Sequence, residues 1–270
     1  MFIGTLLLQP LTFLFFLSRI ISVGGDGMYS EVMNGLVLRT QKDAGVDHNT
    51  PEARMQPCDI PIGIIPAGSG DVLCMFLYGT RDPETCALHI IKGFQRSTNI
   101  YSVHYGHKLA CYCGLILGFG FSGYLMRSSN KHRWIGPARY TVMILVYMLK
   151  HAFFKMNVRY LAVNQNGGRE ESRTNGNCTS NVDEVKWTSL MGDFHSIDTW
   201  AVTLARNGEF LQPLFGDTTS TVIMLNKCGR LEHLKYLEQL SKLKSVCVSH
   251  CAPSSTSFFF SFLIFSSSFK

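Results

Sequence analysis

Two glycine-rich loops carry the residues best suited to phosphate chemistry. The first, Val23-Gly24-Gly25-Asp26-Gly27, follows a short β-branched stretch and precedes residues 28–40, whose apolar side chains recur at helical spacing. Glycines let a backbone approach an anion closely, and the N–H groups and positive dipole end of a following helix attract negative charge. The pattern predicts a phosphate-binding loop that places Asp26 beside the transferred phosphoryl group.

The second loop is Pro66-Ala67-Gly68-Ser69-Gly70-Asp71, which lies between the apolar run 62–65 and the helix-like segment 72–78. Two strand–loop–helix units predict an α/β nucleotide domain with both loops at the carboxyl edge of its sheet. Neither loop has the Gly-x-x-x-x-Gly-Lys-Ser/Thr or the Gly-x-Gly-x-x-Gly pattern, which argues against an ordinary P-loop or Rossmann domain.

Several stretches of the sequence resemble the diacylglycerol kinase catalytic domain family, which includes the sphingosine and ceramide kinases. Within that family they are most similar to the ceramide kinases. The likeness is strong from about residue 20 to about residue 140, weak from about 190 to 240, and missing at both ends. The similar stretches are residues 24–32, 39–41 with 44–47, 62–69, 87–90 and 131–140.

The resemblance implies an α/β + β architecture, in which a partial α/β nucleotide-binding domain with glycine-rich phosphate loops precedes a β-rich lipid-binding domain. ATP would bind in the cleft between them. It implies an ATP- and Mg²⁺-dependent lipid kinase that phosphorylates the primary hydroxyl of ceramide or a related sphingolipid at a membrane surface. The expected division is an apolar segment outside the family (1–19), a nucleotide domain (20–100), a lipid domain (101–245) and a Ser/Phe-rich tail (246–270).

The same resemblance implies roles for individual residues. Asp26 matches the proposed acceptor of the lipid hydroxyl proton, and the substrate-binding loop comprises Gly24, Gly25, Asp26 and Gly27. A guanidinium suits phosphate oxygens, so the physics agrees with the two arginines in the nucleotide set. The residues matched to ATP contacts are Glu31, Gly68, Ser69, Gly70, Arg133, Arg139, Gly216 and Asp217, the last also a candidate for magnesium contact.

Simpler interpretations of these residues stay open. Aspartate is favoured at helix starts, so Asp26 could cap the helix predicted for residues 28–40. Arg133 and Arg139, with Lys131 and His132 beside them, could form a solvated basic face.

The sequence also departs from the family pattern. Tyr124 stands where the resembling kinases carry an aspartate that engages the lipid head group, and Asn130 replaces another acid. Thr218 replaces a glycine and Thr221 an aspartate in the C-terminal segment. These losses predict poor phosphoryl transfer, so the main alternative is a catalytically weak nucleotide- or lipid-binding protein. Sphingosine, diacylglycerol and NAD kinases, and a phosphofructokinase-like enzyme, are further alternatives.

Composition fits a cytoplasmic enzyme that binds membranes peripherally. The net charge of +6 suits an anionic nucleotide or membrane surface. No basic stripe interleaved with aromatics is present, so no nucleic-acid partner is expected. The nine cysteines include no Cys-x-x-Cys pair, so we expect buried free thiols and no structural zinc site.

The two ends do not follow the family. Residues 1–18 are uncharged and contain Pro10, and they fit neither a signal peptide nor a membrane span well. No room is left before Gly24 for the family's Asn-Pro-x-Gly-Gly loop, so a truncated or mis-spliced start is expected. The tail 252–270 shows no periodicity that would place it.

The remaining segments are predicted from their apolar pattern. Residues 99–103 are predicted to form a strand, and residues 109–125 a glycine-containing β-structure. The long apolar run 140–154 is predicted to form a helix over the cleft, and residues 164–181 a loop.

Overall fold

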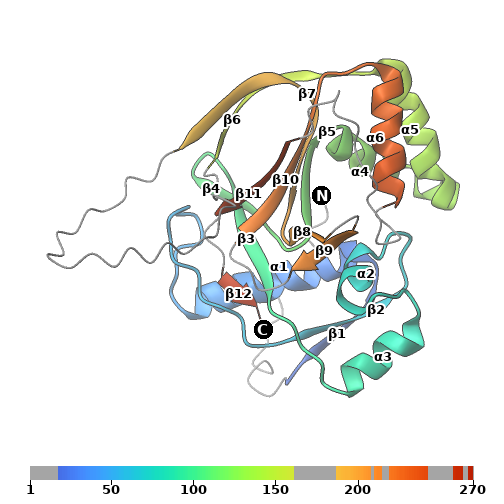
Figure 1. Ribbon diagram of the computed structural model, residues 1–270. Helices are drawn as coiled ribbons and strands as arrows, with labels where there is room; N and C mark the ends of the chain where they lie inside the picture. The colour runs from blue at the N-terminus through green and yellow to red at the C-terminus, as the bar shows by residue number, and fades with distance from the viewer. Residues whose placement is uncertain are drawn as a thin grey trace, which may run out of the picture.

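The computed structural model describes residues 18–160, 187–207, 210–214, 219–242, 258–263 and 267–269. Its first unit is a parallel pair of strands, β1 (Ile20–Gly24) and β2 (Ile62–Pro66), in register from Ile20↔Ile62 to Gly24↔Pro66. Helix α1 (Asp26–Asp43) follows β1, and α2 (Val72–Tyr78) follows β2. Both predicted strand–loop–helix units are present, and their loops leave the same edge of the pair (Figure 1).

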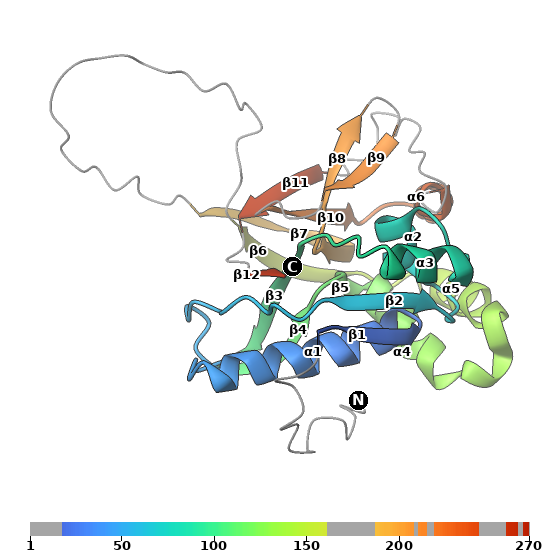
Figure 2. The ribbon, with the colours of Figure 1, turned by 90° about the horizontal axis from the view of Figure 1, so that it is seen from below.

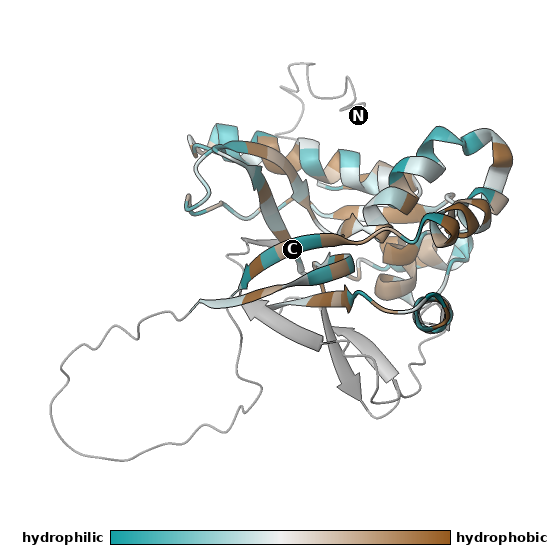
Figure 3. Cartoon of the chain, turned by 90° about the horizontal axis from the view of Figure 1, so that it is seen from above, coloured by the Kyte–Doolittle hydropathy of each residue, from teal (hydrophilic) through white to brown (hydrophobic). Residues whose placement is uncertain are grey.

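Helix α1 packs one face against these strands and α2. Its buried residues Tyr29, Met33, Leu36 and Val37 recur at helical spacing, whereas the opposite face is polar, as the alternating bands in Figure 3 show. The amide of Asn34 donates to Tyr112 O at 2.8 Å and accepts from Tyr112 N at 2.7 Å, which fixes α1 to the strand that carries Tyr112.

A helix and a hairpin complete this half of the molecule. Asp82 caps α3 by accepting a hydrogen bond from Thr85 N at 2.8 Å. The hairpin strands are antiparallel, and a short C-terminal strand pairs with the first of them. The elements are α3 (Pro83–Ile91), β3 (Thr98–Tyr105), β4 (Lys108–Cys113) and β12 (Ser267–Phe269).

The second half is built on an antiparallel five-stranded sheet. Its central strand, β7, pairs with β10 along one edge, while β5 and β6 share the other edge, and β11 lies beyond β10. A separate hairpin, β8–β9, lies on the opposite side of the molecule from α1 (Figure 2). The strands are β5 (Ile116–Gly120), β6 (Phe154–Tyr160), β7 (Thr188–Trp200), β8 (Thr203–Asn207), β9 (Phe210–Leu214), β10 (Thr219–Asn226) and β11 (Phe258–Leu263).

Helices flank one end of this sheet. Phe121, Tyr147 and Met148 form a small core there, with an edge-to-face contact of 4.8 Å between the rings of Phe121 and Tyr147. Among the described residues no helix is long and apolar enough to cross a bilayer. The elements are α4 (Phe121–Lys131), the 3₁₀ segment η3 (Arg133–Ala138), α5 (Arg139–Lys150) and α6 (Arg230–Lys242).

The prediction of β-structure across residues 109–125 is wrong at its C-terminal end. Strand β5 stops at Gly120, whose φ of +73° turns the chain into α4. A Cβ at that position would lie 2.3 Å from His195 O, so only glycine permits this close crossing. The predicted helix over residues 140–154 likewise ends early, at Lys150, because His151 is left-handed and β6 begins at Phe154.

Two further expectations concern the C-terminal half and the thiols. The loop predicted for residues 164–181 lies outside the described residues. Part of the tail without periodicity forms β11 and β12, which pair with strands distant in sequence. The six described cysteines are free, and burial raises the pKa of the Cys74 thiol to about 12, so that thiol is protonated near neutral pH.

Candidate active site

The two glycine loops touch each other backbone to backbone. Ala67 N donates to Gly24 O at 3.1 Å, which continues the β1–β2 pairing into the loops. A Cβ on Gly68 would lie 2.5 Å from Gly25 Cα, and one on Gly25 would lie 3.0 Å from Gly68 Cα. Gly25 and Gly68 are therefore required by the mutual packing of the loops, whatever ligand the loops hold.

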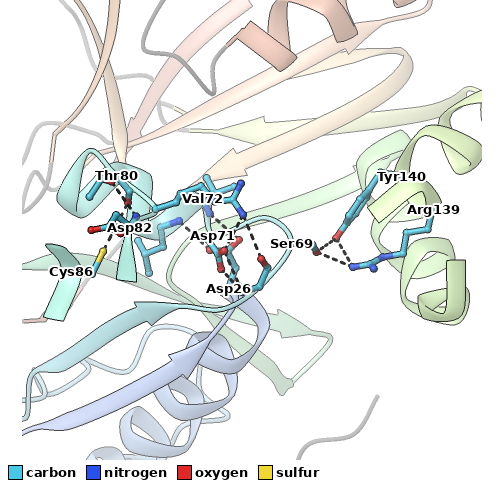
Figure 4. A network of polar contacts seen from close by, with 12 residues as sticks. Asp26, Ser69, Asp71, Val72, Thr80, Asp82, Cys86, Arg139 and Tyr140 are labelled. Atoms are coloured by element: carbon cyan, nitrogen blue, oxygen red, sulfur yellow. Dashed lines mark hydrogen bonds and ion pairs between the residues drawn. The ribbon is translucent and has the colours of Figure 1, made fainter. Parts of the chain in front are cut away.

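Asp26 stands at the junction of the loops. Its two carboxylate oxygens accept hydrogen bonds from Val72 N and Leu73 N, each at 3.0 Å, at the start of α2 (Figure 4). The capping interpretation thus identified the right kind of interaction but the wrong helix: α1 has no side-chain cap, and Asp26 caps α2 instead. Because each carboxylate oxygen has two lone pairs, one on each remains for a further partner.

A second acid, Asp71, shapes the second loop. It is 3% exposed, and its oxygens accept from Gly68 N at 3.0 and 3.2 Å and from the Arg81 guanidinium at 3.1 Å. Its left-handed φ of +50° carries the chain from the loop into α2. Sequence reasoning assigned Asp71 no role, although an acid just before a helix is a common structural signal.

Ser69 and Arg139 meet on the outer side of the second loop. The Arg139 guanidinium donates to Ser69 Oγ at 2.9 Å and to the Tyr140 hydroxyl at 3.1 Å, as Figure 4 shows. Its Nε is buried without a partner. Within the described part of the chain, the N–H groups of Ser69 and Gly70 also have no acceptor. Such unused donors beside a cation suit a phosphate group.

Two other predicted site residues, Arg133 and Glu31, take no part in the contacts at this junction. Arg133 is exposed and donates to Asn130 Oδ1 at 3.3 Å. Glu31 is exposed on α1, one turn beyond the loop. Gly216 and Asp217 lie outside the described residues.

Two of the positions that depart from the family pattern, Tyr124 and Thr221, are packed. The Tyr124 ring lies 5.4 Å from that of Tyr147, and Lys150 Nζ lies 5.6 Å from the Tyr124 ring centroid. Thr221 is 2% exposed in β10. Both side chains contribute to the interior of the second half of the chain.

A cavity opens at the other end of the β1–β2 pair, away from the glycine loops. It is lined by Arg19, Tyr78 and His89 with the starts of β2 and β3. Since the loops leave the carboxyl ends of the strands and this cavity lies at their amino ends, it does not belong to the candidate site.

A buried carboxylate, Asp198, was not singled out from the sequence. It lies in β7, where one oxygen accepts from Ser122 Oγ at 2.9 Å and from Ser196 Oγ at 3.0 Å while the other has no partner. Burial raises the pKa of this carboxyl to about 6, against the opposing effect of the two hydroxyls. No local motif signals it, because its surroundings come from β5, α4 and β7.

Asp198 should make folding stability depend on pH. Because its pKa is raised from the ordinary 3.8, the folded state binds more protons between about pH 4 and pH 6. The free energy of unfolding should therefore fall as pH rises through that window, by roughly 3 kcal/mol in total, and then level off. Denaturant unfolding measured across pH 3.5–7 checks this slope.

Two variants isolate the contribution of Asp198. Asp198→Asn removes the titrating group, so the slope should flatten, whereas Asp193→Asn, on the same strand but partly exposed, should keep it. An unchanged slope in Asp198→Asn would assign the pH dependence to other groups.

The first part of the chain is similar to a family of lipid kinases. Residues 16–103 match the family described as the diacylglycerol kinase catalytic domain. This segment contains both glycine loops and helices α1 to α3. This match confirms the resemblance to that family noted in the sequence of the segment.

Curated proteins similar to this chain include a ceramide kinase and a sphingoid-base kinase. Human ceramide kinase is 36% identical over 245 residues, covering 81% of this chain and 46% of the human protein. Sphingoid long-chain bases kinase 1 of Arabidopsis thaliana is 35% identical over 144 residues, covering 53% of this chain and 17% of that protein. The chain thus spans less than half the length of these relatives.

Among solved structures, the chain is similar to a diacylglycerol kinase from Bacillus anthracis. The TM-score is 0.46 at 14% sequence identity, and the match covers 91% of this chain and 64% of that one.

Proposed function

We propose that the chain carries the catalytic machinery of a lipid kinase that transfers the γ-phosphoryl group of ATP to the primary hydroxyl of ceramide. The observation that carries the proposal is the contact between the two glycine loops. The carboxylate of Asp26 thus lies beside a second loop that offers Ser69 and unused N–H donors, and Arg139 of α5 contacts that loop. The similarity to ceramide kinases supports ceramide, while the sphingoid-base kinase supports a related sphingolipid as the alternative.

The residues divide the chemistry between them. As the hydroxyl oxygen of the lipid attacks the γ-phosphorus and ADP leaves, Asp26 accepts the hydroxyl proton. It does so with a carboxylate lone pair that is not used by the N–H groups of α2. The N–H groups of Ser69 and Gly70 bind phosphate oxygens, and Arg139 offsets the charge that develops on them. Arg133, Glu31, Gly216 and Asp217 are proposed as further nucleotide contacts, and Gly24, Gly25 and Gly27 as the loop nearest the lipid hydroxyl.

Magnesium fits this assignment as a partner of the nucleotide. Mg²⁺ is usually held by one or two carboxylates together with the substrate phosphates, and when bound it neutralises phosphate charge. Asp71 of the second loop is already paired with Arg81 and Gly68 N. The oxygen donors proposed for Mg²⁺ are therefore Asp26 of the first loop and the proposed nucleotide contact Asp217.

We further propose that the protein is cytoplasmic and reaches its lipid as a peripheral membrane protein. Helix α5 exposes Val142, Leu145 and Leu149, which are spaced to lie on one face, and Trp134 in the preceding 3₁₀ segment is 83% exposed. Exposed apolar side chains of this kind suit the interfacial region of a bilayer.

The test is a radiolabelled transfer assay. The chain is incubated with γ-labelled ATP, Mg²⁺ and mixed micelles that contain ceramide, sphingosine or diacylglycerol, and in parallel with NAD. We expect saturable labelling of ceramide. Labelling of another lipid would support a lipid kinase with a substrate other than ceramide. Labelling of NAD alone would overturn the lipid-kinase proposal.

A second candidate function is nucleotide or lipid binding with little transfer. It is favoured by Tyr124, whose ring is packed against Tyr147 at a position where the resembling kinases have an acid. ATP binding measured by calorimetry without labelling of any acceptor would support this candidate over the first.

Arg139 should be needed for ATP binding. Its side chain lies against Ser69 and has one buried unpaired N–H, so Arg139→Ala should weaken ATP binding by about 1.5–3 kcal/mol. Arg133→Ala should weaken it by a similar amount if that side chain turns to the phosphates. The affinities are measured by calorimetry.

Arg159→Ala serves as the charge-matched control. Arg159 lies in β6, outside the two loops, and its guanidinium packs over the ring of Trp187. If Arg133→Ala and Arg139→Ala both bind ATP as tightly as the control does, these arginines belong to a solvated basic face and do not contact the nucleotide.

A further inference from the structure

Three histidines from distant parts of the chain meet between α5, β7 and α6. His151 follows the last turn of α5, His195 lies in the middle of β7, and His233 lies in the first turn of α6. Each can present a ring nitrogen so that the three nitrogens lie within 4.8 Å of one another. The ring centroids are 4.3 Å apart for His151 and His195, 4.9 Å for His195 and His233, and 5.6 Å for His151 and His233.

The cluster is buried and its hydrogen bonding is incomplete. His195 and His233 are fully buried, and His151 is partly buried. Both ring nitrogens of His233 and Nε2 of His151 are buried without a partner. Buried polar groups are costly when left unsatisfied, so three such nitrogens in one place point to a ligand that satisfies them.

The surroundings of His195 indicate what kind of ligand. Its Nδ1 lies 2.8 Å from Ala152 O, and its Nε2 lies 3.4 Å from Cys228 O. A neutral imidazole donates from one nitrogen only, so donation from Nδ1 to Ala152 O leaves a lone pair on Nε2. A metal-binding histidine usually donates from one ring nitrogen to a backbone carbonyl or carboxylate, as Nδ1 of His195 can, and binds the ion with the other nitrogen.

The protonation state of the cluster agrees with this arrangement. Burial, reinforced by the neighbouring histidines, lowers the pKa of His233 to about 4, and burial also lowers the pKa of His151. Both rings are therefore neutral near pH 7, which is the form that binds a metal. Of the charged groups nearby, Arg230 opposes a cation, while Glu232 is bonded to Gly229 N.

We propose that His151, His195 and His233 form a transition-metal site whose preferred ion is Zn²⁺. Three imidazoles suit zinc, and tetrahedral Zn–N bonds of about 2.0–2.1 Å require nitrogens about 3.4 Å apart. The ring nitrogens, now within 4.8 Å of one another, would move closer by ring rotation, and water would complete the coordination. No cysteine takes part in this site. Its three histidines are distant in sequence and are brought together only by the fold.

The site joins α6 to α5 and β7. A hydrogen bond from Arg230 Nε to Met148 O at 3.2 Å, between residues 82 positions apart, already links α6 to α5. Zinc bound there would hold α6 against the sheet. Helix α5 also carries Arg139 at its other end, where Arg139 contacts Ser69, but the three histidines take no part in the proposed phosphoryl transfer.

The experiment measures zinc on the full chain. The chain is stripped with a chelator and dialysed, and Zn²⁺ is titrated in competition with a chromophoric chelator, with bound metal counted by mass spectrometry. We expect one Zn²⁺ per chain and a rise in the thermal midpoint on zinc addition. His233→Gln and His151→Asn should each weaken zinc affinity at least tenfold and abolish the rise.

The variants include their own controls. Asn tolerates the left-handed backbone of position 151, so His151→Asn should fold and decides the matter if His233→Gln does not. His107→Asn removes an exposed histidine outside the cluster and should leave zinc binding unchanged. Zinc affinity that is the same in His151→Asn and His107→Asn, or less than one ion per wild-type chain at saturation, would overturn the proposal.

Discussion

Asp26→Asn should lower the rate of phosphoryl transfer to ceramide at least a hundredfold while leaving ATP affinity within about tenfold. The carboxylate is assigned proton acceptance, for which loss of a positioned general base typically costs 10²–10⁴-fold in rate. An amide has the same shape but cannot take up the proton. Initial rates in the labelled-ATP assay and ATP affinities from calorimetry measure the two quantities.

The same substitution also disturbs a helix cap, and a matched variant separates the two effects. In Asp26→Asn the amide NH₂ must face Val72 N or Leu73 N, so the free energy of unfolding should fall by about 1–3 kcal/mol. Asp82→Ala removes a cap from α3, outside the glycine loops. Asp82→Ala should cost stability without loss of transfer. If Asp26→Asn keeps more than about a tenth of the wild-type rate, Asp26 is only a cap.

The sequence predicts the glycine loops and their flanking elements well because their signals are local. A β-branched run, a glycine turn and an apolar helical repeat each lie within about ten residues. The structure has β1, α1, β2 and α2 where these signals place them. The resemblance to the family rests on the same stretch of chain, and the family match covers it.

Helix α4 shows where local pattern fails. The segment 109–125 alternates apolar residues and glycines, which is typical of strands, and β4 and β5 do form in it. The change to helix at Phe121 depends on Gly120 crossing His195 O and on Phe121 packing against Tyr147, and both partners are distant in sequence. Tertiary contacts therefore override the local preference.

The candidate site divides in the same way. The residue types in the loops were predicted, but the partner of Asp26 was not, because α2 reaches it only after β1 and β2 have paired. Arg139 meets Ser69 across 70 residues, so its proximity follows from the fold and not from the motif. The histidine cluster shows no sequence signal at all, since its members are separated by 44 and 38 positions.

Gly68→Ala should be the most disruptive glycine-to-alanine change within the two glycine loops. The added methyl group would lie 2.5 Å from Gly25 Cα and 2.7 Å from Asp71 Oδ1. The first neighbour is backbone, and the second is held by Arg81, so neither can yield cheaply. We expect a loss of about 3 kcal/mol in the free energy of unfolding, at the upper end of overpacking effects, and at least a tenfold loss of ATP affinity.

Gly27→Ala provides the matched control, because it adds the same methyl group to the other loop where no atom lies within 4 Å. Gly27 is already helical in α1, so alanine there should leave stability unchanged or raise it by up to about 1 kcal/mol. Denaturant midpoints compare the two variants. Equal stability of Gly68→Ala and Gly27→Ala would mean that the loops separate freely, and the contact that brings Asp26 to the second loop could then not position it for catalysis.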